Sequence, residues 1–191
     1  MPDKDAHLRW KELSRRTIAS GGIFDLFAAD RMSHGGLRGE FWILEARDWV
    51  TVVPVIQDTA GEPCFIMVRQ YRHGAETITT EFPAGLVEHG EDPRAAAERE
   101  LLEETGFRAG RMTLIGSVSP NPAFMSNRCF TYLAEDLTRS GEKSLDPLEQ
   151  LEAVEVPVPV VSRRIGTGEL INSLVAVAFL WYTRTRATGG L

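Results

Sequence analysis

Runs of apolar residues along the chain predict a sheet-rich fold. β-branched and other apolar residues fill positions 50–56 and 64–68, and a turn-forming segment at 58–63 separates the two runs. This pattern is typical of two strands joined by a short turn. Further short strands are predicted at 112–117, 129–133 and 154–156. Pro157 and Pro159 indicate that the last of these lies at a sheet edge or leaves the sheet irregularly.

The first 47 residues have a different character. Two short aromatic-rich strands are predicted at 23–27 and 39–44, with a turn at 33–36 between them. A β-meander of this size has little core of its own. We therefore expect residues 1–47 to form an antiparallel β extension that leans on a main domain at 48–191.

Two segments carry helix signals. Asp92 suits an N-cap, Pro93 suits the first turn, and Gly106 suits a left-handed C-cap, which predicts a helix between them. A second, apolar helix is predicted at 171–186, with Asn172 as a possible cap. Strands surrounding two strong helices indicate a mixed α/β or α+β sandwich.

Composition narrows the function classes. The chain has 191 residues, 43% of them hydrophobic, and a formal net charge of −6. An acidic chain has no general attraction for phosphate backbones, so we expect no nucleic-acid partner. The longest apolar run, 174–182, falls far short of the roughly 20 residues that span a bilayer, so we expect no membrane segment. With no signal peptide visible, we expect a cytoplasmic protein whose Cys64 and Cys129 are buried, reduced thiols.

The predicted helix after Asp92 carries three carboxylates on one face. Glu100 and Glu104 lie about 40° apart around a helix, and Glu103 lies about 60° to the other side of Glu100. Like charges at this spacing repel, and they stand near the negative end of the helix dipole. A bound hard cation would reverse both penalties, and oxygen ligands without histidine or cysteine favour Mg²⁺ or Mn²⁺. A solvated acidic face is the alternative interpretation.

The segment 85–107 resembles the Nudix box, Gly-x5-Glu-x7-Arg-Glu-U-x-Glu-Glu-x-Gly-U, where U is a bulky aliphatic residue. The positions in register are Gly85, Glu91, Arg99, Glu100, Leu101, Glu103, Glu104 and Gly106. Only the last position departs from the pattern, because Phe107 replaces the aliphatic residue. The resemblance implies a Nudix-type α/β/α sandwich that hydrolyses a diphosphate linked to another moiety, with divalent cations held by the box.

The resemblance also implies roles within the box. Glu100 and Glu104 should ligate Mg²⁺ or Mn²⁺, with the Ala84 carbonyl as a further ligand. Glu103 should assist directly or through water. Arg99 should be mainly structural and orient carboxylates such as Glu91.

Residues before the box resemble the ADP-ribose and nucleoside-diphosphate-sugar pyrophosphatase branch. In that branch the arginine matching Arg72 contacts the diphosphate, and the glutamate matching Glu81 lies near metal or substrate. A surface ion pair is the alternative for Arg72 and the favoured interpretation for Arg69. The N-terminal extension of that branch commonly mediates homodimerisation and lends aromatic side chains to the nucleobase pocket. Phe24 and Trp42 hold comparable places, although core packing would also explain them.

The branch further uses a loop glutamate beyond the box as the general base. The resemblance suggests Glu152, just before the strand at 154–156, as the first candidate, with Glu149 as the second. Glu155 is expected to face solvent. Each candidate could instead be a plain surface carboxylate.

One departure from the branch bears on the substrate. ADP-ribose hydrolases often carry Pro-Gly and a nearby acidic residue where this chain has Pro122-Ala123 and then Ser126-Asn127. The sequence therefore predicts a hydrolase of a nucleoside diphosphate sugar, with ADP-ribose favoured but a broader range open. A house-cleaning nucleoside triphosphate pyrophosphatase and a non-catalytic nucleotide-sugar sensor are the alternatives.

Overall fold

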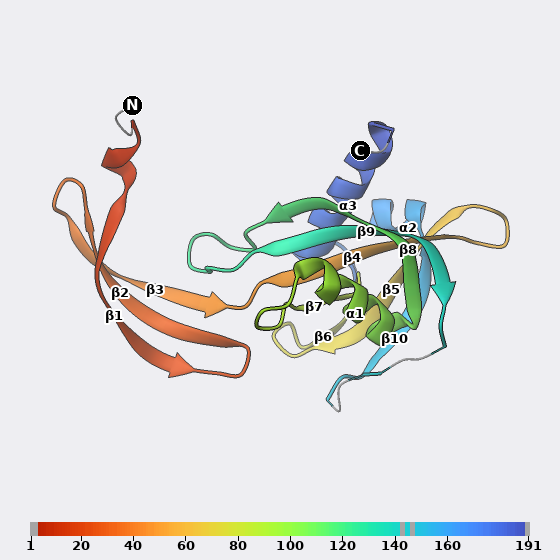
Figure 1. Ribbon diagram of the computed structural model, residues 1–191, viewed down its shortest axis with the longest axis horizontal. Coiled ribbons are helices and arrows are strands. Elements are labelled where there is room, and N and C mark those ends of the chain that lie inside the picture. The colour runs from red at the N-terminus through yellow and green to blue at the C-terminus, as the bar shows by residue number, and fades with distance from the viewer. Residues whose placement is uncertain (1–3, 142–143, 146–147, 190–191) are drawn as a thin grey trace. The chain divides into compact units, whose positions relative to one another are not determined.

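The chain folds into two compact units. The computed structural model describes residues 4–141, 144–145 and 148–189. One unit comprises residues 1–47 and 119–128, and the other comprises residues 48–118 and 129–191. The first unit thus contains a loop that lies beyond the predicted 1–47 extension. Figure 1 shows the elements of each unit, which are described separately below.

Strands dominate the described part of the chain. In chain order the elements are η1 Ala6–Leu8, β1 Trp10–Ser20, β2 Phe24–Ser33, β3 Arg38–Ala46, β4 Trp49–Gln57, β5 Pro63–Arg72, β6 Thr77–Glu81, β7 Ala84–Leu86, α1 Pro93–Thr105, β8 Phe107–Val118, β9 Cys129–Arg139, β10 Leu151–Pro157, α2 Val158–Arg164 and α3 Ser173–Ala187.

The first unit is a three-stranded antiparallel sheet in the order β1-β2-β3. The loop 119–128 lies along β3, where the Leu44 N–H donates to the Phe124 carbonyl at 2.8 Å. The two predicted strands are present but longer than expected, and β1 was not predicted. The reason is that β1 is exposed along nearly its whole length, so its polar residues show no apolar alternation. Ion pairs support it instead, with Arg15 bonded to Glu12 at 2.9 Å and to Glu45 at 2.7 Å.

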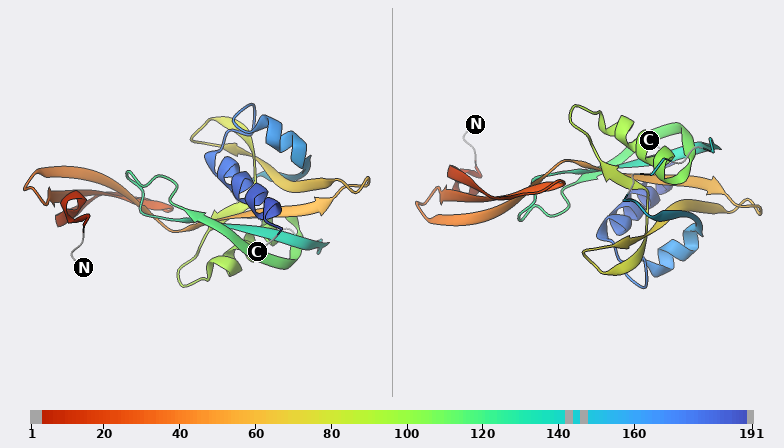
Figure 2. Two further views of the ribbon diagram at one scale, coloured as in Figure 1. Left: turned by 90° about the horizontal axis from the view of Figure 1, so that it is seen from above. Right: turned by 90° about the horizontal axis from the view of Figure 1, so that it is seen from below.

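The second unit is built on a mixed, seven-stranded sheet. Its central order is β10-β5-β4-β9-β8, while β6 pairs with β5 and β7 pairs with β4. Strands β4 and β9 run parallel, and the other pairs are antiparallel. Figure 2 shows α1 on one side of this sheet and the blue helices α2 and α3 on the other. The predicted mixed α/β sandwich is confirmed.

Each face of this sheet has its own hydrophobic core. Under α1, Leu101 packs with Val50, Val52 and Tyr132. On the α2 and α3 side, Phe65 stacks edge-on against Phe82 at 5.1 Å and against Tyr182 at 4.9 Å. These two cores hold the strands that present the polar site residues.

Strand β10 lies at the edge of the sheet, as the prolines at 157 and 159 predict, and helix α2 follows it. The strand ends at Pro157, and the chain continues directly into the helix. Proline lacks only an N–H that the first helical turn does not use, so both prolines are compatible with a helix start.

The two cysteines have the surroundings that the sequence predicts. Cys64 and Cys129 are buried and free. No helix among the described residues combines the length and the apolar character needed to cross a membrane.

Gly116 in β8 allows helix α3 to pack closely against the sheet. A Cβ placed there would lie 2.3 Å from the Trp181 ring of α3. We expect Gly116→Ala to lower the stability by about 1–3 kcal/mol, because the ring must leave its packed position. Thermal unfolding measures the change. Gly74→Ala is the matched control, since a Cβ there meets nothing within 4 Å; equal losses in both variants would contradict the packing described for Trp181.

Candidate active site on helix α1

Local capping places α1 as the sequence predicts. The Asp92 carboxylate accepts a hydrogen bond from the Arg94 N–H at 2.9 Å, and Gly106 ends the helix in the left-handed region with φ of 75°. Glu100 and Glu104 are buried against the sheet, with 8% and 2% of their surface exposed. The solvated acidic face is therefore excluded for these two residues.

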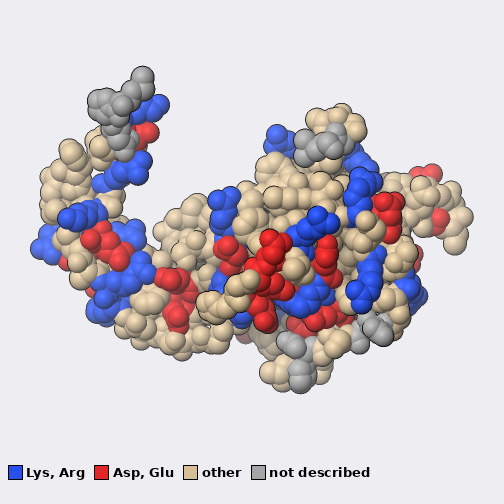
Figure 3. Space-filling view, viewed as in Figure 1, with Lys and Arg blue, Asp and Glu red and all other residues tan. Residues whose placement is uncertain are grey.

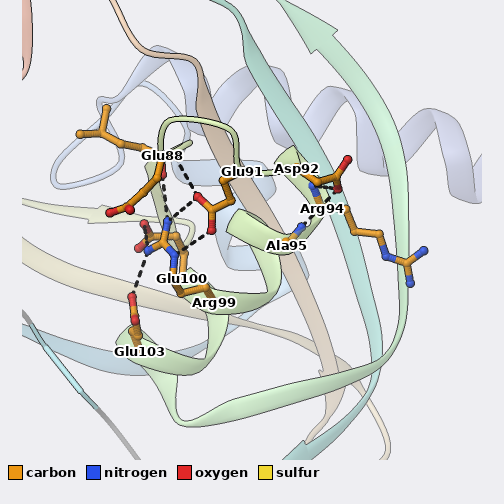
Figure 4. Close-up of polar contacts among 9 residues, drawn as sticks. Glu88, Glu91, Asp92, Arg94, Ala95, Arg99, Glu100 and Glu103 are labelled. Atoms are coloured by element: carbon orange, nitrogen blue, oxygen red, sulfur yellow. Dashed lines mark hydrogen bonds and ion pairs between the residues drawn. The ribbon is translucent and has the colours of Figure 1, made fainter.

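Arg99 bonds three of the acidic side chains around it. It donates from Nε to Glu91 at 3.0 Å, and from Nη1 to Glu100 at 2.7 Å and to Glu103 at 3.1 Å. Its Nη2 also donates to the Leu86 carbonyl at 3.0 Å. Figure 4 shows Arg99 lying among Glu91, Glu100 and Glu103. These bonds, first that to Glu91, raise the pKa of Arg99, so its charge is permanent.

The strand before the box fits closely against α1. The Ala84 N–H donates to Glu104 Oε2 at 3.0 Å. At Gly85 a Cβ would lie 1.9 Å from Glu100 Oε1. Glycine is required there because only a residue without a side chain leaves room for the carboxylate. Ala84 and the two buried glutamates are thus brought together as the resemblance implies.

Burial disfavours the ionised form of the Glu100 and Glu104 side chains. Burial and the nearby charge of Glu100 raise the pKa of Glu104 to about 8. Burial also raises the pKa of Glu100, although Arg99 opposes the shift. A site that crowds desolvated carboxylates in this way favours a positive partner beyond Arg99.

The ligand atoms available here are oxygens, which is the type that Mg²⁺ and Mn²⁺ bind. Within the described ranges no three histidine, cysteine, aspartate or glutamate side chains converge closely enough to hold a metal by themselves. Mg²⁺ does not require such a cage, because it typically binds one or two carboxylates and completes its shell with water and substrate phosphates. Glu100 and Glu104 offer oxygens of that type, with Ala84 bonded to Glu104 through its N–H and Glu103 bonded to the same Arg99 as Glu100. Figure 3 shows red acidic side chains interleaved with blue basic ones over the region of α1.

Arg72 and Glu81 form a bidentate pair on the neighbouring strands. Arg72 donates from Nε to Glu81 Oε1 at 3.0 Å and from Nη2 to Oε2 at 2.7 Å. Thr79 and Asn172 donate to the same carboxylate, each at 2.7 Å. Burial acts to raise the pKa of Glu81, but Arg72 and the two other donors outweigh it, so that the pKa lies below its usual range. Arg72 therefore forms an ion pair, which is the alternative interpretation of this residue. The charges of Glu104 and Glu149 also act on the Arg72 guanidinium.

The two candidate bases lie in different surroundings. The expectation that Glu152 precedes the strand is wrong, because β10 already begins at Leu151 and pairs Glu152 with Arg69. The Arg69 guanidinium binds the Glu152 carboxylate directly. Glu149 lies in the exposed segment before β10, and its charge raises the pKa of both Glu100 and Glu104. Glu149 is thus the candidate whose charge acts on the buried glutamates of the acidic helix.

Arg69 forms ion pairs, which is the interpretation favoured from the sequence. Besides Glu152, it binds Glu169 through two hydrogen bonds of 2.9 and 3.0 Å. Arg69 and Arg72 are three residues apart in β5, so their side chains point to opposite faces of the strand. Arg69 and Glu169 line a cavity of about 310 Å³ together with Leu170. Glu155 is exposed, as expected.

Phe24 and Trp42 lie in the first unit. The register pairs Phe24 with Ala46 and Trp42 with Ala28, which places both aromatic rings on one face of that sheet. They keep 41% and 56% of their surface exposed, so core packing within the unit does not explain them.

Sequence reasoning missed three polar residues around Arg69 and Glu81. Thr79 and Glu169 were not singled out, and Asn172 was considered only as a helix cap. Their contacts join residues 2, 91 and 100 positions apart. The one available signal was the Thr-rich segment before Glu81, since alternate threonines in a strand can donate toward the same face.

The cation requirement gives a stability prediction for Glu104→Gln. Without divalent cations the variant should be about 1–3 kcal/mol more stable than the wild type, because it removes a buried carboxylate but keeps an acceptor for the Ala84 N–H. Adding Mg²⁺ or Mn²⁺ should raise the melting temperature of the wild type but not of the variant. Thermal unfolding in EDTA and in each metal measures both effects.

Glu98→Gln on the exposed side of α1 is the control. It should leave the metal-induced shift intact. A wild-type melting temperature that no divalent cation changes would contradict the assignment of Glu104.

Comparison with known proteins shows the family of this chain. The NUDIX domain family matches residues 47–166. An ADP-ribose pyrophosphatase of Bacillus subtilis is 33% identical over 172 residues, which cover 90% of this chain and 91% of the relative. A methanol dehydrogenase activator of Bacillus methanolicus is 29% identical and covers 88% of this chain and 89% of its own. The crystal structure of an ADP compounds hydrolase superposes with a TM-score of 0.81, at 24% identity, over 96% of this chain and 97% of that one. The chain therefore belongs to the NUDIX domain family and is a Nudix hydrolase.

Proposed function

We propose that this protein hydrolyses the diphosphate bond of a nucleoside diphosphate sugar, with ADP-ribose as the favoured substrate and Mg²⁺ or Mn²⁺ as the cofactor. The products are a nucleoside monophosphate and a sugar phosphate. The observation that carries the proposal is the crowding of the buried Glu100 and Glu104, with the Arg72 guanidinium close enough to act on Glu104. Relatives named ADP-ribose pyrophosphatase, among them the Bacillus subtilis protein, support the substrate class.

Each residue has a task that follows from its surroundings. Glu100 and Glu104, with the Ala84 carbonyl, would hold the cation, and Glu103 would assist. The cation would supply charge neutralisation and an acidified water. Arg99 keeps Glu100 and Glu103 oriented through the hydrogen bonds described above. Arg72, a planar and permanent cation, would grip the diphosphate, since a guanidinium matches paired phosphate oxygens.

Glu149 is the proposed general base. It lies in the segment before β10, its charge reaches both buried glutamates, and it can accept the proton of a water bound near them. Glu152 is the second candidate; it lies within β10, where the Arg69 guanidinium binds its carboxylate. A base in an exposed segment can approach the water once substrate is bound.

The first unit would contribute to substrate recognition. Phe24 and Trp42 present exposed rings on one face of its sheet. Such rings could stack on a nucleobase. We propose that the protein is a homodimer in which this unit mediates association.

A regulatory role is the second candidate. The relative from Bacillus methanolicus is called an activator of another enzyme. Its similarity extends over 88% of this chain, so the same kind of role is a candidate for this chain. The presence of Glu100, Glu103 and Glu104 together favours hydrolysis over a binding-only role.

A substrate panel distinguishes these functions. Purified protein is incubated with ADP-ribose, other nucleotide sugars and nucleoside triphosphates, each with Mg²⁺ or Mn²⁺, in ¹⁸O-labelled water. We expect nucleoside monophosphate and sugar phosphate from the nucleotide sugars, with the label reporting which phosphorus is attacked. Release of pyrophosphate from triphosphates alone would support a triphosphate pyrophosphatase. Binding of nucleotide sugars without turnover would support a sensor.

Paired substitutions test the assignment of the base. Glu149→Gln should lower kcat by about 10²–10⁴-fold, because it removes the group that takes the proton. Glu152→Gln should stay within about threefold of the wild type. Steady-state kinetics on the best substrate of the panel measures both. The reverse order of effects would assign the base to Glu152.

A further inference from the structure

The segment between α2 and α3 is fixed to the edge of β6. The Thr80 N–H donates to the Glu169 carbonyl at 2.8 Å, and the Thr80 hydroxyl donates to the Glu169 carboxylate at 2.8 Å. Arg69 donates to both oxygens of that carboxylate, one of which is the oxygen that the Thr80 hydroxyl also uses. Arg69 and the Thr80 hydroxyl lower the pKa of Glu169 to about 2, so the anchor is charged at any ordinary pH. The chain therefore enters α3 from a defined position beside β6.

Asn172, three residues after this anchor, uses both ends of its amide. Its Oδ1 accepts the Leu174 N–H at 2.9 Å and so caps α3. Its Nδ2 donates to Glu81 Oε2 at 2.7 Å. Only this orientation of the amide satisfies both neighbours, because one needs an acceptor and the other a donor.

The bond from Asn172 Nδ2 ends on Glu81 Oε2, an oxygen that also accepts from Arg72. Glu81 Oε2 accepts from Arg72 Nη2 and from Asn172 Nδ2, while Oε1 accepts from Arg72 Nε and Thr79. Glu81 is only 3% exposed, so water has little access to replace a lost donor. With both oxygens occupied, the carboxylate is held in one plane. The planar Arg72 guanidinium is held in the same plane through its two parallel bonds.

We propose that Asn172 is a positioning residue that orients Arg72, through Glu81, for binding the diphosphate of the substrate. The inference rests on the proposed function in one respect, namely that Arg72 contacts the diphosphate. The helix cap would be a side effect of the same amide. The alternative is that Asn172 serves α3 alone.

Two variants separate these roles. Asn172→Ser keeps a good capping oxygen but is too short to reach Glu81, whereas Asn172→Ala removes both functions. If Asn172 positions Arg72, both variants should raise KM for the best nucleotide sugar about tenfold, with kcat within about threefold of the wild type. The melting temperature should fall in both variants, because both remove a donor to the buried Glu81 carboxylate, and should fall further in Asn172→Ala, which also loses the cap of α3. A wild-type KM in Asn172→Ser would overturn the proposal.

A double substitution tests whether the effect passes through Arg72. Arg72→Lys cannot form the two parallel bonds and should itself raise KM. Adding Asn172→Ser to Arg72→Lys should then raise KM by less than about twofold more, because the positioned group is already gone. Full additivity of the two effects would overturn the proposed route.

A readout without substrate keeps this inference separate from the proposed function. In ¹⁵N-labelled wild-type protein, the Arg72 Nε–H proton should exchange slowly with water, and its signal is assigned by its loss in Arg72→Lys. Asn172→Ser should speed this exchange at least fivefold. Failure of the substrate panel with faster exchange in the variant would reject the activity but retain the positioning; unchanged exchange would reject the positioning.

Discussion

Repulsion between carboxylates that the fold has removed from water governs the site on α1. Glu100 and Glu104 are held against the sheet, and Gly85 permits that approach because it has no side chain. Arg99 neutralises part of this charge through its bonds to Glu91, Glu100 and Glu103. Burial, and then the nearby charge of Glu100, raise the pKa of Glu104 to about 8, so its ionised form is disfavoured here. A divalent cation is the partner that such a cluster would accept most readily.

A second polar centre complements this cluster with opposite chemistry. Arg72, Thr79 and Asn172 all donate to the Glu81 carboxylate, and together they lower its pKa despite burial. The sheet brings the two centres together, since β6 leads to Glu81 and β7 begins at Ala84, three residues later. One centre is thus built to attract a cation, and the other fixes a guanidinium. A diphosphate bound to metal requires both.

The sequence predicts those features whose causes are local. Asp92, Pro93 and Gly106 define α1 through capping, and the spacing of Glu100 and Glu104 places them on one face. Features that depend on partners far away in the sequence cannot be predicted from it in this way. Whether Glu152 stands in a loop or in a strand is decided by its pairing with Arg69, 83 positions away. Likewise, the role of Asn172 beyond its cap depends on Glu81, and β1 lacks the apolar alternation from which a strand is recognised.

Calorimetric titration with Mn²⁺ tests the central claim most directly. Wild-type protein at neutral pH, titrated with Mn²⁺ in the presence and absence of a nucleotide sugar, should take up the ion with measurable heat. Uptake should be accompanied by proton release, since Glu104, whose pKa is raised to about 8, must ionise to bind the cation. Absence of any Mn²⁺ or Mg²⁺ uptake, with and without the nucleotide sugar, would contradict the account of the acidic helix as a cation site.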